Sequence, residues 1–344
     1  MAQVDHTGGN GAEPAYRGRS AMKNDSIVAM IAVAPMMERT DRHCRYLLRL
    51  ISPRTRLYTE MITAAALVQG GRLHLLEFHP SEHPVALQLG GSDPGELGRA
   101  AALGAAAGYD EINLNVGCPS SRVQSGRFGA ALMAEPRRVA DCLRTMLGAV
   151  DLPVTVKTRT GIDDLDSYEF LHGFVGAVAD AGCRTVVIHA RKAILSGLSP
   201  KQNRQVPPLD YDRVYRLKSD YPALRVILNG GLDSQAKVLE QFGRVDGVML
   251  GRYAYGNPWV LAELDSRLGR CRGVACREDA VRKYISYMGG ELQRGTSLKA
   301  MTRHLVGLFA GRPGARAWRR FLSELPPGQA GHDALRVRVR TGLP

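Results

Sequence analysis

The chain has 344 residues, of which 44% are apolar and 23% are charged, and this composition allows a large core and excludes global disorder. Its formal net charge of +13 favours a polyanionic partner, whereas no apolar run approaches the roughly 20 residues that a membrane-spanning helix needs. Residues 1–20 contain no signal segment, and the six cysteines show neither a disulfide framework nor zinc spacing, so we expect a reduced, cytoplasmic chain without a metal site, a membrane segment or an obligate protein partner.

Residues 1–25 are rich in glycine and polar side chains, and we expect them to form a disordered tail. Short β-branched runs then alternate with helical patterns such as those at 94–109 and 135–150. Eight runs predict strands, at 27–34, 57–59, 84–90, 111–115, 153–158, 185–190, 225–230 and 246–251. Eight strand–helix units within about 225 residues predict an α/β fold, a TIM (β/α)8 barrel, over residues 26–265. A doubly wound open sheet is the alternative, but APMMERTDR follows the first strand in place of G-x-G-x-x-G.

The chemistry of such a barrel lies at the carboxyl ends of its strands. Nearly every predicted strand ends in a polar or backbone-exposing group, and a purely structural barrel has no need of so many on one rim. In chain order these groups are Pro35, Met36 and Met37; Thr59 and Glu60; Gln88; Asn113 and Asn115; Lys157; His189; Asn229, Gly230 and Gly231; and Gly251 and Arg252.

The last two of these strand ends indicate a phosphate site. Asn229, Gly230 and Gly231 follow the seventh predicted strand, and Gly251 and Arg252 follow the eighth. Glycine allows backbone N–H groups to approach a ligand closely, and loops at these two places often bind phosphate. Either turn alone would usually be ordinary turn chemistry, but the two together favour phosphate.

Lys157 and His189 are expected to point into the same barrel mouth. A cation there could stabilise negative charge on a reduced flavin ring, and Gln88 could hydrogen-bond the ring. Lys157 could instead be a salt-bridge partner and His189 a satisfied core residue. With the apolar surface of Pro35 and Met36, the set suits FMN better than a small sugar phosphate.

Cys118 lies on a polar loop between Gly117 and Pro119, just beyond the fourth predicted strand. A thiol above a barrel mouth can act as a nucleophile or a general acid. The alternative is a buried, inert thiol, which fits the helical or buried patterns around Cys142 and Cys183.

The strand–helix rhythm stops near residue 265. Patterns at 276–293, 297–309 and 315–325 predict helices, and they define a small all-helical domain over 266–326. Residues 327–344 are expected to be a disordered tail. Residues 266–344 hold 16 basic and 5 acidic residues, a net of +11, whereas residues 1–265 carry +2. This asymmetry indicates nucleic acid or a membrane surface as the partner, although a solvated helical face is equally compatible with charge alone.

Seven segments carry a family resemblance: APMMERTDRHCR (34–45), LNVGCPSSRVQSGRFGAALM (114–133), VKTRTGID (156–163), HARKAILSGLSPKQNRQVPPL (189–209), NGG (229–231), DGVMLGRYAYGNP (246–258) and GARAWRRFLSE (314–324). In this order, over 27–325, they resemble the tRNA-dihydrouridine synthase family and in particular its A-type subgroup. Ala131 and Thr160 depart from the expected cysteine and isoleucine.

The resemblance implies a flavoprotein oxidoreductase that reduces the C5–C6 double bond of uridine in the tRNA D-loop, at U20 and U20a. NADPH, or alternatively NADH, would reduce FMN, the flavin N5 would give hydride to C6, and Cys118 would protonate C5. An ordinary thiol is mostly protonated at neutral pH, so it can serve as this acid.

The resemblance also assigns binding roles. Asn115 would contact the uracil, and Lys201, Arg204, Arg316 and Arg319 would contact the RNA. The last two lie three residues apart and share a helix face. FMN would be held by Pro35, Met36, Met37, Gln88, Lys157, His189, Asn229, Gly230, Gly231, Gly251 and Arg252.

Two other functions compete with this interpretation. A flavoenzyme that acts on a free pyrimidine base would share the barrel, FMN and the loop cysteine, but it has no need of a basic helical domain. A non-catalytic RNA-binding protein on a similar barrel has no need of the cysteine, lysine and histidine set.

Overall fold

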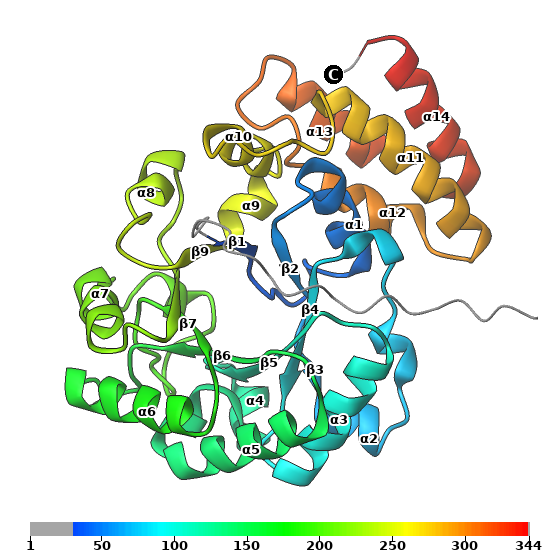
Figure 1. The fold of residues 1–344 in the computed structure, drawn as a ribbon. Coiled ribbons are helices and arrows are strands. Elements are labelled where there is room, and N and C mark those ends of the chain that lie inside the picture. Colours follow the sequence, from blue (N-terminus) through cyan, green and yellow to red (C-terminus); the bar gives the residue numbers. More distant parts are fainter. Residues whose placement is uncertain (1–29, 343–344) are drawn as a thin grey trace, which may run out of the picture.

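The structure is a computed structural model that describes residues 30–342, and its centre is a closed barrel of parallel strands (Figure 1). Eight of the nine strands form the barrel, because β1 pairs with both β2 and β9, and β2 pairs in turn with β4. The remaining strand, β3, pairs only with the end of β4. The strands are β1 (Met30–Val33), β2 (Arg56–Tyr58), β3 (Ile62–Thr63), β4 (Val85–Gly90), β5 (Glu111–Val116), β6 (Val154–Arg159), β7 (Thr185–His189), β8 (Arg225–Asn229) and β9 (Gly247–Leu250).

The closure of the sheet confirms the predicted TIM barrel. The alternative, an open doubly wound sheet, is wrong because the first and last strands hydrogen-bond along Met30–Val33. All eight predicted strands are present, and β3 is additional. Residues 27–29 of the expected first strand, and the tail expected over 1–25, lie outside the described residues.

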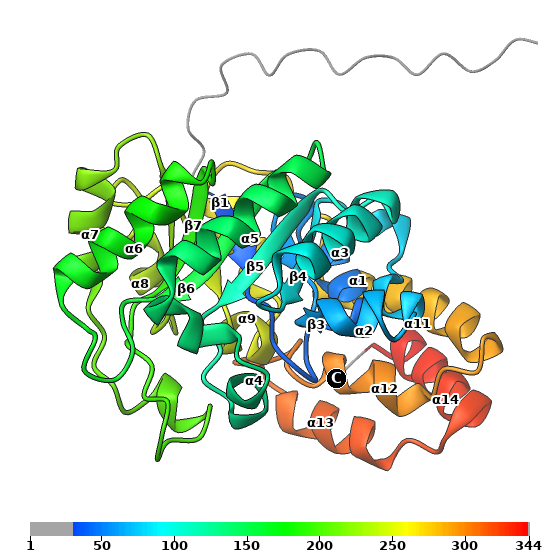
Figure 2. The ribbon, with the colours of Figure 1, turned by 90° about the horizontal axis from the view of Figure 1, so that it is seen from below.

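Helices cover the outside of the barrel (Figures 1 and 2). Their starts follow local rules: in α3, Asp93 caps the N–H of Glu96 and Pro94 occupies the first turn, where it has no hydrogen bond to lose. No helix within residues 30–342 is both long and apolar enough to cross a bilayer. The helices around the barrel are α1 (Arg42–Ile51), α2 (Ala64–Val68), α3 (Pro94–Ala106), α4 (Ser121–Ser125), α5 (Pro136–Ala149), α6 (Tyr168–Asp180), α7 (Tyr211–Asp220), α8 (Gln235–Leu239), α9 (Arg252–Gly256) and α10 (Val260–Arg267), with short 3-10 turns η1 (Leu73–Leu76), η2 (Pro80–Glu82), η3 (Gly129–Ala134) and η4 (Gln202–Arg204).

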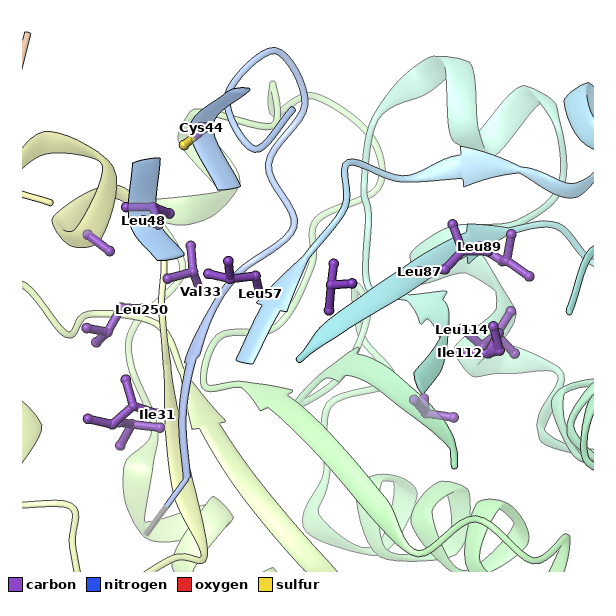
Figure 3. Packing of buried hydrophobic residues seen from close by; sticks show 14 of the residues in the cluster. Ile31, Val33, Cys44, Leu48, Leu57, Leu87, Leu89, Ile112, Leu114 and Leu250 are labelled. Carbon is purple, nitrogen blue, oxygen red and sulfur yellow. The ribbon is translucent and has the colours of Figure 1, made fainter. Parts of the chain in front are cut away.

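Side chains alternate along each strand between two apolar cores. Outward residues pack against the helices, and Figure 3 shows Val33 and Leu57 beside Leu48 of α1. Inward residues form a separate small core inside the barrel, made of Ala32, Ala34, Tyr58, Ala86, Val187, Ile227 and Met249. Because the period is two, the same alternation decides which residues at the strand ends face the barrel mouth.

The C-terminal helices dock on α1. They are α11 (Arg277–Gln293), α12 (Leu298–Thr302), the 3-10 turn η5 (Arg303–Leu305), α13 (Ala315–Glu324) and α14 (Gly328–Arg340). Tyr284 of α11 is fully buried, and its hydroxyl donates to the backbone carbonyls of His43 and Met301. Arg42 of α1 forms a 2.6 Å ion pair with Glu291. The domain boundary expected between residues 265 and 266 falls inside α10.

The disordered tail expected over 327–344 is wrong for most of that segment, because residues 328–340 form α14. Leu335 is fully buried, and the Nε2 atom of His332 lies 2.9 Å from the carbonyl oxygen of Ile285 in α11. Gly331 lies so close to Pro326 that a Cβ atom there would be 2.1 Å from its carbonyl oxygen. The buried face of α14 thus consists mainly of small and polar residues, so the sequence has a weak helical apolar signal there.

The helix expected over 297–309 is present only in its first half, as α12 and η5. Ser297 caps its start by accepting the N–H of Ala300 at 3.3 Å. Gly307 then packs against the backbone of Gly256, where a Cβ atom would lie 2.5 Å from the carbonyl oxygen. This backbone approach turns the chain and ends the helix.

Candidate active site

A cavity of about 1280 Å³ opens at the carboxyl ends of the barrel strands. Every residue that the sequence analysis assigned to FMN lines it, and so do Asn115, Cys118 and Arg204. The strand register explains this convergence, since Asn115 pairs with Lys157 and His189 with Asn229 across neighbouring strands. Lys201, Arg316 and Arg319 do not line the cavity.

Two glycines form a cradle in the cavity wall after β8. Gly230 has a φ of +103° and Gly231 a φ of +67°, which side-chain-bearing residues rarely adopt. A Cβ atom on Gly230 would lie 2.9 Å from a ring carbon of His189. Tyr211 donates its hydroxyl to the carbonyl of Gly230, and Asn229 donates its amide to the carbonyl of Met249 at 2.6 Å. The wall is therefore rigid and leaves its backbone open to the cavity.

The cavity wall holds more cations than carboxylates: Glu38 and Asp233 line it, and Asp233 pairs with Lys237. Burial and the neighbouring Arg159 lower the pKa of Lys157 to about 7, and burial lowers that of Arg159 to about 10. Within residues 30–342, no ion pair to a carboxylate is formed by any of Lys157, Arg159, Arg191, Arg204 and Arg252. Such a wall favours an anionic ligand, because the ligand would supply negative charge beside these cations.

His189 is neutral in this setting. Burial, followed by the charges of Arg159 and Lys157, holds the pKa of His189 well below its usual value. Its Nδ1 atom is buried and has no hydrogen-bond partner among the described residues. A buried polar atom without a partner is costly, so this nitrogen is a candidate ligand contact.

Cys118 is the half-buried thiol of the cavity wall, and its backbone is held at both ends. Its N–H donates to Asn115 Oδ1 at 3.0 Å, and its carbonyl accepts the N–H of Ala130 at 2.9 Å. Gly129 has a φ of +72°, and a Cβ atom there would come within 2.6 Å of the Cys118 carbonyl oxygen. The glycine therefore permits the turn that presents Cys118.

The sequence analysis missed four arginines of the cavity wall, namely Arg39, Arg122, Arg159 and Arg191. Arg159 donates to the carbonyls of Gly117 and Asn203, so it ties the Cys118 loop to the loop after β7. It lies two residues after Lys157 on β6, and strand alternation alone could have placed it in the mouth. Arg39 and Arg191 lie on loops, where no such period applies.

The residues expected to contact RNA lie outside the cavity or at its rim. Arg204 is exposed at the rim, and Lys201 is exposed nearby in the loop after β7. On α13, Arg316 and Arg319 are exposed while Trp318 is fully buried, as the predicted helix face requires. Figure 2 shows α13 on the same side of the molecule as α4, which follows the Cys118 loop. In the described part of the chain no cluster of three or more acidic, histidine or cysteine side chains could hold a metal ion.

The chain is similar in sequence to proteins of one family. The family model described as dihydrouridine synthase (Dus) matches residues 32–339. A protein of Shewanella oneidensis is 56% identical over 294 residues, which cover 85% of this chain and 88% of that protein. A protein of Escherichia coli K12 is 55% identical over 295 residues, covering 85% of each. A protein of Xanthomonas campestris is 55% identical over 294 residues, covering 86% of this chain and 88% of its own length. All three bear the name tRNA-dihydrouridine(20/20a) synthase.

Proposed function

The chain belongs to the dihydrouridine synthase family and is an enzyme, and from this premise we propose that it reduces uridine to 5,6-dihydrouridine at positions 20 and 20a of the tRNA D-loop. The names of its relatives support the substrate. The observation that carries the proposal is the half-buried thiol of Cys118 on the wall of a cavity lined with unpaired cations. A tRNA substrate also places the reaction in the cytoplasm.

The residues of the cavity suit FMN as the cofactor. The partnerless Nδ1 atom of His189, the glycine cradle and the unbalanced cations fit a polar ring system that carries a phosphate. When bound, FMN supplies hydride for C6 of the uracil and is re-reduced by NADPH or NADH. Gly230, Gly231, Asn229, Gly251 and Arg252 would face the phosphate. The other FMN contacts would be Pro35, Met36, Met37, Gln88, Lys157 and His189.

Cys118 donates a proton to C5 of the uracil in this proposal, and Asn115 orients the base. Reduction of a C=C bond needs one hydride and one proton, and Cys118 is the cysteine that lines the cavity. Arg159 donates to the carbonyl of Gly117 and Asn115 accepts the N–H of Cys118, so both residues hold the loop that presents the thiol.

The helical part over 266–342 binds the tRNA in this proposal. The target uridine must be unstacked and turned into the barrel mouth, and this needs contacts that hold the RNA backbone. Arg316 and Arg319 on α13, with Lys201 and Arg204 beside the mouth, would supply them. All four are exposed, and none of them pairs with a carboxylate of residues 30–342; both observations support this assignment.

The cellular test is the tRNA of a strain that lacks this protein. Digested D-loop fragments from that strain should lose the two-hydrogen mass increase at uridines 20 and 20a, and the intact gene should restore it. Unchanged masses at both positions would refute the proposed substrate.

The Cys118→Ala variant tests the acid. Turnover of tRNA should fall by a factor of about 100 or more, because general acid catalysis typically contributes that much. Flavin absorbance should remain, because the cation set and the glycine cradle are untouched. Cys271→Ala is the matched control, since Cys271 is exposed and does not line the cavity. Normal turnover in Cys118→Ala would remove the acid role.

A further inference from the structure

One side of the barrel interior holds a stack of buried polar side chains. All of its members are at most 8% exposed, and all come from strands β2, β4, β5 and β6. Below the cavity, apolar side chains pack beside the stack, among them Ala32, Ala86, Val187, Ile227 and Met249. We call this stack the polar column; it consists of Tyr58, Glu111, Thr155, Asn113, Gln88 and Asn115.

The lower end of the polar column is a carboxylate at the start of β5. Glu111 Oε1 accepts hydrogen bonds from the hydroxyls of Tyr58 at 2.6 Å and Thr155 at 2.7 Å, and Arg56 lies 3.5 Å from Oε2. Burial and the Glu111 charge raise the pKa of Tyr58 well above its usual value, so this hydroxyl stays a donor. Because Thr155 gives its only hydrogen to Glu111, its oxygen must accept from Asn113, and Asn113 Nδ2 does lie 2.7 Å away.

The upper end of the polar column is the Cys118 loop. Gln88 Nε2 donates to Asn113 Oδ1 at 2.7 Å, and Asn115 Nδ2 donates to Gln88 Oε1 at 2.8 Å. Asn115 Oδ1 then accepts the backbone N–H groups of Gly117 at 3.1 Å and Cys118 at 3.0 Å.

The groups at the two ends of the polar column impose the same direction of hydrogen-bond donation on every amide between them. Two backbone N–H groups require Asn115 to turn its oxygen towards the loop, and the Glu111 carboxylate requires Thr155 to donate downwards. A flipped amide anywhere between them would set donor against donor or acceptor against acceptor. The amides of Gln88 and Asn115 each keep one more N–H outside the column, and both residues line the cavity.

We propose that Glu111, Thr155 and Asn113 are positioning residues, which orient the Gln88 and Asn115 amides and hold the Cys118 loop through a one-way chain of hydrogen bonds. The inference rests on the proposed function for its catalytic meaning. Aliphatic side chains usually fill a barrel interior of this kind, and buried polar groups are costly unless every one is paired. A stack that is polar along its whole length therefore indicates a functional role at its upper end, where the cavity begins.

Three variants at the base of the column separate positioning from simple structural support. Thr155→Val keeps the shape of the side chain and removes its hydrogen bonds with Glu111 and Asn113. Thr155→Ser keeps the hydroxyl that makes these bonds. Tyr58→Phe is the matched control, because it removes an equally buried hydrogen bond to the same oxygen atom and leaves the chain to Cys118 intact. The measurements on the full-length protein are the melting temperature, the rate of Cys118 alkylation by iodoacetamide read on the digested peptide, the Kd for FMN, and kcat and KM for tRNA.

In Thr155→Val, iodoacetamide should alkylate Cys118 at least threefold faster than in the wild type. The kcat of this variant should fall about tenfold, the equivalent of 1.4 kcal/mol, and its KM for tRNA should not change. Thr155→Ser should lie within twofold of the wild type. Tyr58→Phe should lower the melting temperature without changing alkylation. Equal alkylation rates in Thr155→Val and Tyr58→Phe, or a loss of melting temperature alone, would overturn the proposal. Should Thr155→Val not fold, Asn113→Leu breaks the same chain and must show the same pattern.

Alkylation and melting require neither FMN nor tRNA. A protein that binds no flavin and turns over no tRNA would therefore refute the proposed function, while the alkylation rates would still decide whether the polar column holds the Cys118 loop.

Discussion

At the scale of single residues, the site depends on cations that form no ion pair with a carboxylate within residues 30–342. Lys157 and Arg159 face one cavity together with the neutral His189, and Arg159 donates to backbone carbonyls. Outside the cavity Arg45 is paired with Glu82 at 2.6 Å, whereas the buried Arg49 donates to backbone carbonyls such as those of Ser52 and Thr55. The cavity differs because several such cations surround one open space, and this grouping favours an anionic ligand.

The first prediction concerns the pH dependence of FMN binding. Because the pKa of Lys157 is about 7, its charge is present below pH 7 and is lost above it, so an anionic ligand should bind more weakly as the pH rises from 7 to 9. Because a single proton on Lys157 is lost, the affinity for FMN can fall by at most about tenfold per pH unit. The quenching of FMN fluorescence measures the affinity. Lys157→Met should bind weakly with a flat profile, and a profile as steep as that of the wild type would assign the dependence to another group.

At the scale of elements, α1 joins the barrel to the C-terminal helices. Asp41 is the N-cap of this helix and accepts the N–H of Cys44 at 2.9 Å. The same carboxylate pairs with Arg303 and His304 of η5. One side chain therefore starts a barrel helix and anchors the helical part of the chain.

The second prediction follows from this double role. Burial alone would raise the pKa of Asp41, but the hydrogen bond and charge of His304, the N–H of Cys44 and Arg303 hold it well below its usual range. A lowered folded-state pKa gives stability that is present above the unfolded value of about 4 and is lost as the pH falls below it.

Asp41→Asn should therefore lower the free energy of unfolding at pH 7 by about 1–3 kcal/mol, and its difference from the wild type should shrink below pH 4. Asparagine also caps helices well, so the variant reports mainly the lost charge. Urea unfolding at pH 7 and pH 3.5 measures both values. Asp141→Asn, in an exposed pair with Arg144, is the control and should change little. A constant difference at both pH values would contradict the assignment.

The third prediction concerns two helical glycines whose replacement should have opposite effects. Gly331→Ala in α14 places a Cβ atom 2.1 Å from the Pro326 carbonyl oxygen, so it should destabilise the fold by about 1–3 kcal/mol. Gly290→Ala in α11 meets nothing within 4 Å, so it should stabilise by about 0.5–1 kcal/mol. Thermal unfolding compares the two. If Gly331→Ala were as stable as Gly290→Ala, α14 would not pack as described.

At the scale of the whole molecule, charge is divided between a nearly neutral barrel and basic C-terminal helices. Residues 266–344 carry a net of +11, and α14 adds Arg336 and Arg340 to the exposed arginines of α13. Because α13 lies on the side of the Cys118 loop (Figure 2), an RNA held there would reach the cavity mouth.

The fourth prediction is a steep salt dependence of tRNA binding. Each phosphate contact releases counterions and contributes about 0.7–0.9 to the slope of log K against log salt. Arg316→Gln with Arg319→Gln should lower that slope by about 1.4–1.8, as read from filter binding between low and physiological salt. Arg144→Gln, at an exposed site on α5, should leave the slope unchanged. A slope that is flat in the wild type would contradict RNA binding by this surface.

Much of the fold could be predicted from the sequence because its signals are local. The apolar runs of the strands, the periodicity of the helices and the glycine turns after β8 and β9 each depend on neighbouring residues. Strand order together with the barrel rule then placed Cys118, Lys157 and His189 on one rim. The roles of these residues stay predictions.

What only the tertiary structure decided depends on contacts between distant segments. The helix α14 forms because Gly331 and His332 meet surfaces that its own pattern does not reveal. The polar column exists because residues from four strands come within hydrogen-bond distance inside a closed barrel. Periodicity determines which way a side chain points, whereas the three-dimensional fold determines what it meets there.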